Sequence, residues 1–212
     1  MSDNIRLRFA PSPTGPLHIG GLRTALYNYL ISKKLKGKFI LRIEDTDLKR
    51  YNKKAEKHIL DSLKWCKILP DESPEKPGDY GPYRQSERKN IYQKFINLLI
   101  KSGHAYFAFD KKETLEEKRK KCEKNGKTFI YNWHNRLKLN NSLSISNEKI
   151  KELAQNNNYV VRFKTVHSGK SKNIITINDE IRGKIQVDLN NLDDKIICKS
   201  DGMPTYHLAN VV

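Results

Sequence analysis

Long apolar runs are absent from this chain of 212 residues. A helix that crosses a bilayer needs about 18 or more consecutive apolar residues. The N-terminus, MSDNIRLRF, is also not followed by the apolar stretch of a secretory leader. The absence of both features argues against a membrane-spanning segment and against a recognisable secretory leader. We therefore expect a cytoplasmic protein that does not associate with membranes.

Cysteine is scarce as well, with three residues, Cys66, Cys122 and Cys198, that lie far apart. An odd and scattered set argues against a disulfide framework and fits a reducing compartment. The sequence has no CxxC or CxC pair. Because cysteine-rich zinc sites are built from such pairs, no zinc is expected.

Positive charge is in excess, since 41 lysines and arginines face 24 acidic residues and the formal net charge is +17. An excess of this size suggests a polyanionic partner, with nucleic acid first. Most of the positive residues are lysines, and the chain is also rich in asparagine and isoleucine. Biased codon usage can produce that combination without any partner, so both explanations stay open on charge alone.

The N-terminal third alternates between strand and helix patterns. Apolar spacing predicts a strand over 5–9, a helix over 22–35, a strand over 39–43 and a helix over 48–66. This order, with nearly continuous apolar strands, indicates a parallel sheet covered by helices. Ligands of such sheets sit beyond the carboxyl ends of the strands. The loops 10–17 and 44–47 should therefore meet at one edge and form a site.

The rest of the chain reads as α+β. Helices are expected over 86–102, from a Thr114/Glu117 capping box to Gly126, and over 148–155; strands are expected within 159–165, 173–178, 184–188 and 195–199. In the first of these helices, the inward residues should be Ile91, Phe95, Leu98 and Leu99. The chain ends on the apolar run of SDGMPTYHLANVV, whereas natural C-termini are more often polar. We therefore expect a piece of a longer protein.

The segment RFAPSPTGPLHIGG covers residues 8–21. Its prolines at 11, 13 and 16 restrict the backbone, and its glycines at 15, 20 and 21 let a ligand approach the backbone closely. His18 stands at the start of the expected helix, where unpaired N–H groups and the helix dipole attract phosphate. An imidazole there can donate to phosphoryl oxygens. On residue types alone, a packed Gly/Pro turn with a surface histidine is the other interpretation.

The full string resembles the ATP-binding motif of class I aminoacyl-tRNA synthetases, in the form used by glutamyl-tRNA synthetases. HIGG stands where the class pattern is HIGH, with Gly21 in place of the second histidine, as is common in bacterial glutamyl enzymes. The resemblance continues through LRTALYNYL, FILRIEDTD, GPYRQSER, DEIRG and KSDGMPTYHLANVV. Glutaminyl enzymes have a different loop, Pro-Glu-Pro-Asn-Gly. Enzymes that glutamylate a modified tRNA base usually carry cysteine zinc ligands, which AYFAFDKKET (105–114) lacks.

This resemblance implies an α/β fold, namely a class I Rossmann-like parallel sheet with an inserted α+β connective domain. Residues 1–85 would form the first half of the catalytic domain. Residues 86–198 would form the connective insertion that binds the tRNA acceptor end, and 199–212 would begin the second half. The insertion carries aromatic residues near basic ones: Tyr106, Phe107, Phe109, Tyr131 and Trp133. Such rings can stack on bases, although we expect most of them to form the core of this domain.

The resemblance also assigns site residues. ATP would contact Ala10, Pro11, His18, Gly20 and Gly21, of which the last three are catalytic. Glutamate would contact Arg8, Ser12, Glu44, Tyr206 and Asn210. The chemistry agrees, because free glutamate needs an arginine for a carboxylate and an acid for its ammonium. Arg8 and Glu44 alone can equally be a structural ion pair.

No metal site of the protein's own is expected. Asp45 and Asp47 precede a helix, where acids are more often caps and dipole partners, and we assign Asp47 as a cap. Mg²⁺ would arrive bound to ATP.

The activity implied is that of a glutamate–tRNA ligase, which converts L-glutamate and ATP to glutamyl-adenylate and then loads the 3′ end of tRNA(Glu). A monomer is typical of the family. These residues lack the KMSKS-like lysine motif, so we expect the isolated chain to be inactive. Two alternatives stay open, a glutamylating enzyme for a modified tRNA base and a non-catalytic tRNA-binding module.

Overall fold

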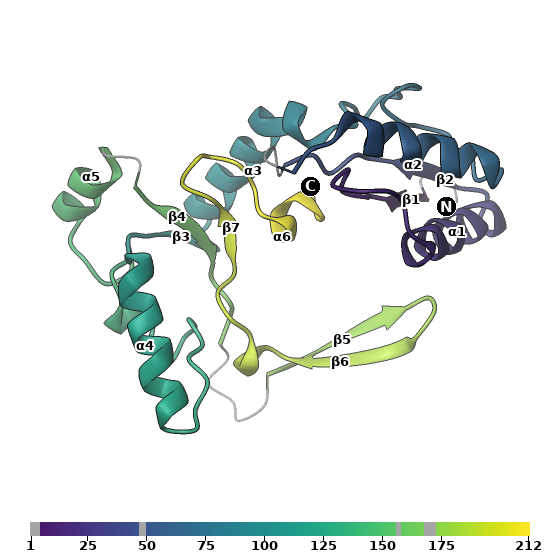
Figure 1. Cartoon of the computed structure of the whole chain (residues 1–212). Helices are drawn as coiled ribbons and strands as arrows, with labels where there is room; N and C mark the ends of the chain where they lie inside the picture. Colours follow the sequence, from purple (N-terminus) through teal and green to yellow (C-terminus); the bar gives the residue numbers. More distant parts are fainter. Residues whose placement is uncertain (1–4, 47–49, 156–157, 168–172) are drawn as a thin grey trace. The chain divides into compact units, whose positions relative to one another are not determined.

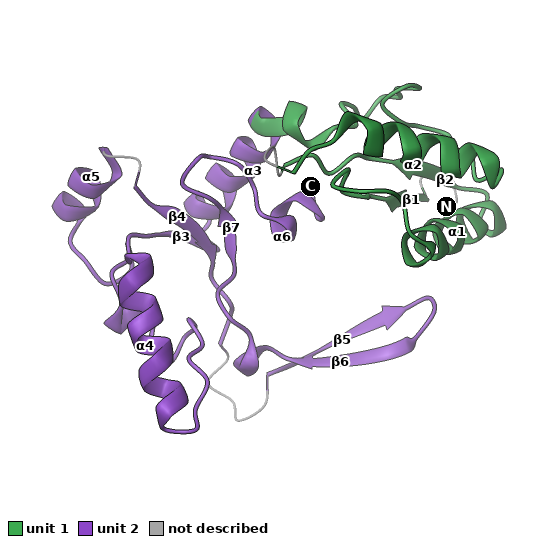
Figure 2. Ribbon diagram, in the orientation of Figure 1, with its two compact units in different colours: residues 1–89 green, residues 90–212 purple. Residues whose placement is uncertain are grey.

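The computed structural model of the chain describes residues 5–46, 50–155, 158–167 and 173–212. The chain divides into two compact units, Met1–Lys89 and Asn90–Val212 (Figure 2). Each unit has a hydrophobic core of its own. The assignment of 86–198 as a connective insertion stays a prediction.

The first unit contains a β-α-β-α series (Figure 1). Its elements are β1 (Arg6–Phe9), α1 (Ile19–Lys34), β2 (Lys38–Leu41), α2 (Lys53–Trp65) and the 3-10 helix η1 (Gln85–Arg88). Strands β1 and β2 pair in parallel, from Arg6 opposite Lys38 to Phe9 opposite Leu41. The predicted parallel sheet is therefore confirmed, and both strands end at the same edge.

The core of the first unit fills the space between this sheet and its helices. Its buried residues are Phe9, Ala25, Phe39, Leu41, Ile43, Ile59, Leu63 and Ile68. The ring of Tyr29 on α1 meets Phe39 edge-on, with centroids 5.8 Å apart. The two strands are thus short but firmly anchored, and they fix the loops that follow them.

Helix α2 begins later than the apolar spacing predicts. Asn52 is extended, at φ −135°, and its side chain accepts the N–H of Lys54 at 2.9 Å. An asparagine in this position satisfies a donor that the first turn leaves open, which defines the start of the helix. Asp47, assigned above as a cap, lies outside the described residues.

An ion-pair network closes the other side of the first unit. Glu72 has a side chain only 4% exposed and pairs with Arg6 at 2.5 Å and with Lys38 at 3.1 Å. The Tyr83 hydroxyl also donates to Glu72. These donors, led by Arg6, lower the pKa of Glu72 to about 2. Because Arg6 and Lys38 are paired neighbours on β1 and β2, the network ties both strands to the segment after α2.

The second unit combines helices with antiparallel strands (Figure 1). Its helices are α3 (Lys89–Lys101), α4 (Lys112–Lys124), α5 (Asn147–Gln155), α6 (Tyr206–Ala209) and the 3-10 turns η2 (Arg136–Lys138) and η3 (Leu189–Asn191). Its strands are β3 (Ala105–Ala108), β4 (Val160–Phe163), β7 (Ile196–Cys198), and a hairpin of β5 (Ile174–Asp179) with β6 (Gly183–Asp188). The sheet order is β3-β4-β7.

Two expectations about the second unit need correction, and one strand was missed. The missed strand is β3, whose sequence AYFA is a short apolar run of four residues. The inward side of α3 carries Tyr92 and Ile96, while Phe95 and Leu98 are 41% and 58% exposed. Helix α4 starts before Thr114: its N-cap is Lys111, which makes no side-chain cap bond. The helix is thus set by packing of Leu115 rather than by a capping box.

No helix in the described part of the chain is both long and apolar enough to span a bilayer.

Candidate active site

The N-terminus of α1 is built around His18. This residue is the N-cap, and its Nδ1 accepts the N–H of Gly20 at 3.1 Å. Since a backbone N–H can only donate, Nδ1 is unprotonated and the ring proton lies on Nε2. The exposed imidazole can therefore donate from Nε2. No acidic residue occupies the first turn, so the positive end of the helix dipole is free to attract an anion.

Two glycines make this arrangement possible. A Cβ on Gly20 would lie 2.9 Å from Cε1 of His18, so a side chain there would push the imidazole off the helix end. A Cβ on Gly21 would lie 2.7 Å from Cδ1 of Leu17. The HIGG form of the motif thus lets Leu17 pack directly over the first turn, where a histidine at position 21 would displace it.

Backbone bonds hold the loop before α1 against the loop after β2. The N–H of Glu44 donates to the carbonyl of Pro11 at 2.9 Å, and the N–H of Asn52 donates to that of Pro13 at 2.9 Å. The expectation that loops 10–17 and 44–47 meet at one edge of the sheet is thereby confirmed for their described residues. Ser12, in the loop before α1, is exposed.

Glu44 is a buried carboxylate at this edge, with 8% exposure. The amide of Gln85 donates to its Oε1 at 3.2 Å. Burial raises the pKa of Glu44, while the positive charges of Arg42 and then Arg8 act in the opposite direction. Burial outweighs both arginines, so the ionised form is not fully compensated by the protein. A cation from a ligand would supply what is missing.

Asp45, the residue after Glu44, binds a different residue, Ser86. It accepts the N–H of Ser86 at 2.8 Å and the Ser86 hydroxyl at 2.5 Å. It therefore caps η1, not the helix that follows it in sequence. Among the residues that the structure describes, no cluster of three or more His, Cys, Asp or Glu side chains could hold a metal.

Sequence reasoning missed Gln85 as a site residue. Its side chain is 1% exposed and its amide orients Glu44. The available signal was its place in GPYRQSER, one of the segments that carries the family resemblance.

The remaining predicted residues, Tyr206 and Asn210, belong to the second unit. Tyr206 opens α6 and is 63% exposed, and the Asn210 amide donates to its hydroxyl at 3.3 Å. Leu208 and Ala209 bury the other side of this helix in the core of the second unit. The two polar side chains thus lie together, whereas Arg8, Ser12 and Glu44 belong to the first unit.

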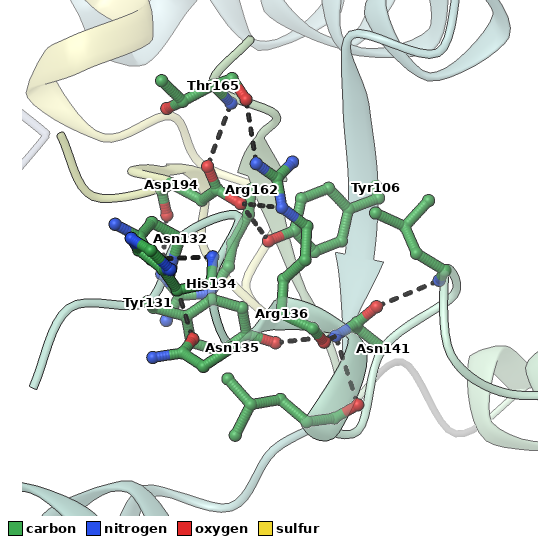
Figure 3. Close-up of polar contacts among 12 residues, drawn as sticks. Tyr106, Tyr131, Asn132, His134, Asn135, Arg136, Asn141, Arg162, Thr165 and Asp194 are labelled. Carbon is green, nitrogen blue, oxygen red and sulfur yellow. Dashed lines mark hydrogen bonds and ion pairs between the residues drawn. The ribbon is translucent and has the colours of Figure 1, made fainter. Parts of the chain in front are cut away.

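A buried polar cluster in the second unit surrounds Asp194 and includes Tyr106, Arg136 and Arg162 (Figure 3). Asp194 is fully buried and accepts from the Tyr106 hydroxyl at 2.7 Å and from the Thr165 N–H at 2.9 Å. Arg136 Nε lies 3.4 Å from its carboxylate, and Arg162 donates to its carbonyl at 2.7 Å. Burial, and then the bond to Asp194, raises the pKa of Tyr106.

The expectation that most of these aromatics are core residues is confirmed. Tyr106, Tyr131 and Phe109 are 1%, 3% and 8% exposed. The ring of Trp133 is stacked on that of His167, with centroids 3.4 Å apart.

The chain matches one protein family over nearly its whole length, and it is similar to two proteins of that family. Residues 4–212 match the family described as tRNA synthetases class I (E and Q), catalytic domain. The chain is 57% identical to the glutamate–tRNA ligase of Christiangramia forsetii over all of its own length and 41% of that protein. It is 55% identical to the glutamate–tRNA ligase of Flavobacterium johnsoniae, over 100% of this chain and 42% of that one.

Solved structures agree. The crystal structure of a glutamate tRNA ligase from Elizabethkingia meningosepticum in complex with its amino acid matches with a TM-score of 0.90 at 50% identity, over 99% of this chain and 41% of that chain. The chain therefore spans about 41% of the length of the relatives it matches. Given the family match over nearly all of its residues, its α/β fold and the His18 helix end, this chain belongs to the class I tRNA synthetases (E and Q), within their catalytic domain.

Proposed function

We propose that this chain is the part of a glutamate–tRNA ligase that binds ATP and L-glutamate and meets the acceptor end of tRNA(Glu). The observation that carries the proposal is the N-terminus of α1, where His18 caps the helix through Nδ1 and offers Nε2–H to an anion. Relatives named glutamate–tRNA ligase, at 57% and 55% identity, support the same activity.

The reaction has two steps. The α-carboxylate of glutamate attacks the α-phosphate of ATP, which forms glutamyl-adenylate and releases pyrophosphate. A hydroxyl of the terminal ribose of tRNA then attacks the activated carbonyl, takes the glutamyl group and releases AMP. Catalysis consists of positioning and charge stabilisation.

The ATP phosphates would lie over the first turn of α1. His18 donates to a phosphoryl oxygen, and the backbone at Gly20 and Gly21 gives the phosphates close access. Ala10 and Pro11 line the approach from the loop. Magnesium comes with ATP as part of the substrate, held partly by its phosphates.

Glutamate would be held by charge complementarity. Glu44 receives its ammonium, which compensates the buried carboxylate that the protein's own arginines leave partly uncompensated. Arg8 pairs with a carboxylate of the substrate, and the Ser12 hydroxyl adds a hydrogen bond. Tyr206 and Asn210 complete the set in this proposal.

The second unit would contact the tRNA acceptor end, and the net charge of +17 favours binding to a polyanion. The protein works as a monomer in the cytoplasm in this scheme.

The test is tRNA glutamylation by the complete gene product, with ATP, radiolabelled glutamate and tRNA(Glu). Transfer of label to the 3′ end, absent when ATP is omitted, is the expected result. Label on a modified internal base would instead identify the base-glutamylating alternative. tRNA binding without any ATP-dependent transfer would indicate a non-catalytic module.

A further inference from the structure

A hydrogen bond connects helix α2 to the residue just before His18. The backbone N–H of Leu17 donates to Nδ1 of His58, which lies 41 residues further along the chain, at 3.2 Å. The hydroxyl of Ser62, one turn later on α2, lies 3.3 Å from the same ring nitrogen. Leu17, His18, His58 and Ser62 line one cavity of about 430 Å³ within the first unit.

The N–H of Leu17 determines which tautomer the His58 imidazole adopts. A backbone N–H has no acceptor capacity, so Nδ1 of His58 must be the acceptor and its ring proton must lie on Nε2. The Ser62 hydroxyl then donates to Nδ1 as well, which stabilises the same tautomer.

Leu17 is fixed from two directions. Its side chain packs against the core of the first unit and over Gly21, where no side chain intervenes. Its N–H is held by His58. Since Leu17 and His18 share a peptide bond, these two contacts set the position from which the His18 imidazole reaches the helix end.

We propose that His58 is a positioning residue for the ATP-binding histidine, holding Leu17 so that His18 is already in place when ATP binds. This inference rests on the proposed function, because it assumes that His18 meets phosphate. In this scheme His58 does not contact substrate. Losing its bond would leave the loop to be ordered by ATP itself, which weakens ATP binding.

The kinetic test uses the complete gene product in glutamate-dependent ATP–pyrophosphate exchange with tRNA present. His58→Phe keeps a ring but removes the acceptor, and the KM for ATP should rise by about 3- to 10-fold, the range for one hydrogen bond. The KM for glutamate should change by less than about twofold, since a single lost bond at Leu17 does not reach that pocket. His58→Asn places an amide oxygen where Nδ1 was and should restore the KM for ATP.

Lys64→Phe is the matched control, because it introduces the same ring at an exposed position of α2. It should leave both KM values unchanged. The proposal is overturned if His58→Phe leaves the KM for ATP unchanged, if it raises the KM for glutamate equally, or if His58→Asn is as impaired as His58→Phe.

Amide hydrogen exchange of Leu17 tests the bond without any catalysis. In the 212-residue chain, exchange should be slow in the wild type and in His58→Asn, and about 3- to 10-fold faster in His58→Phe. Unchanged exchange in His58→Phe overturns the positioning role even if the enzyme is active. A gene product that never glutamylates tRNA overturns the proposed function, whatever the exchange rate of Leu17.

Discussion

Two buried carboxylates, Asp194 in the second unit and Glu44 in the first, have opposite surroundings. Asp194 in the second unit receives Tyr106, Thr165 and Arg136 around a fully buried side chain. Glu44 in the first unit is buried at the end of the sheet, and the attraction of Arg42 and Arg8 does not offset the effect of burial on its pKa. A carboxylate that the protein compensates fully serves the fold, whereas one that it leaves short of positive charge can receive a cation from a ligand.

The largest expected effect tests the structural side of this comparison. Asp194→Ala removes the acceptor and leaves Arg136 and Tyr106 buried without it. The second unit should lose about 3–5 kcal/mol of stability, the range for breaking a buried ion pair. Hydrogen exchange of the β4 amides measures this loss locally.

The adjacent residue offers a matched control. Asp193 pairs with Lys195 at 3.6 Å, and the two side chains are 34% and 51% exposed. Asp193→Ala should therefore change stability by less than about 1 kcal/mol. A similar loss in both variants would contradict the distinction between a compensated buried charge and a surface pair.

A smaller effect is expected from the ion-pair network of the first unit. Its partners lower the pKa of Glu72 from its usual 4.5 to about 2. The stabilisation is therefore complete above about pH 4.5 and is lost as the pH falls toward about 2. It amounts to about 2–3 kcal/mol, allowing for partial solvent screening. Exchange of the β2 amides as a function of pH measures it.

Glu72→Gln removes the charge but keeps the shape. The wild type and this variant should differ in stability at pH 7 and converge near pH 2. A difference that is constant between pH 7 and pH 2 would show that the network acts through packing and not through charge.

The smallest effect concerns helix starts. Asn52→Ala removes the cap of α2 and should cost about 1 kcal/mol. Thr114→Ala on α4 should cost less than about 0.5 kcal/mol, because Thr114 lies inside the helix and caps nothing. Thermal unfolding of both variants compares them. Equal losses of stability in the two variants would support the capping box at Thr114 that the sequence suggests.

These cases show where sequence reasoning succeeds. The alternation of residues 5–9 and the apolar run of 39–43 are local patterns with few competing explanations, so the parallel strands and the loops at their ends were predictable. His18 lies at the end of the loop that follows β1, and Glu44 lies in the loop that follows β2. The length of the matching string identified their family.

Other features depend on contacts that local sequence does not encode. The inward side of α3 is set by the strands and helix it packs against, which select Tyr92 and Ile96 over Phe95 and Leu98. Gln85 meets Glu44, and His58 meets Leu17, only because separate segments fold together. Neither residue type carries a signal of that pairing, so no spacing rule could have found them.

The most direct test of the central claim is glutamyl-adenylate formation by the complete gene product carrying Glu44→Gln or His18→Ala. Glu44→Gln should fold at least as stably as the wild type, because burial disfavours the charge it removes. Both variants should nevertheless lose about 100-fold or more of the activity, while the control His104→Ala, an exposed histidine of the second unit, keeps it. Adenylate formation at the wild-type rate in both variants would contradict the account.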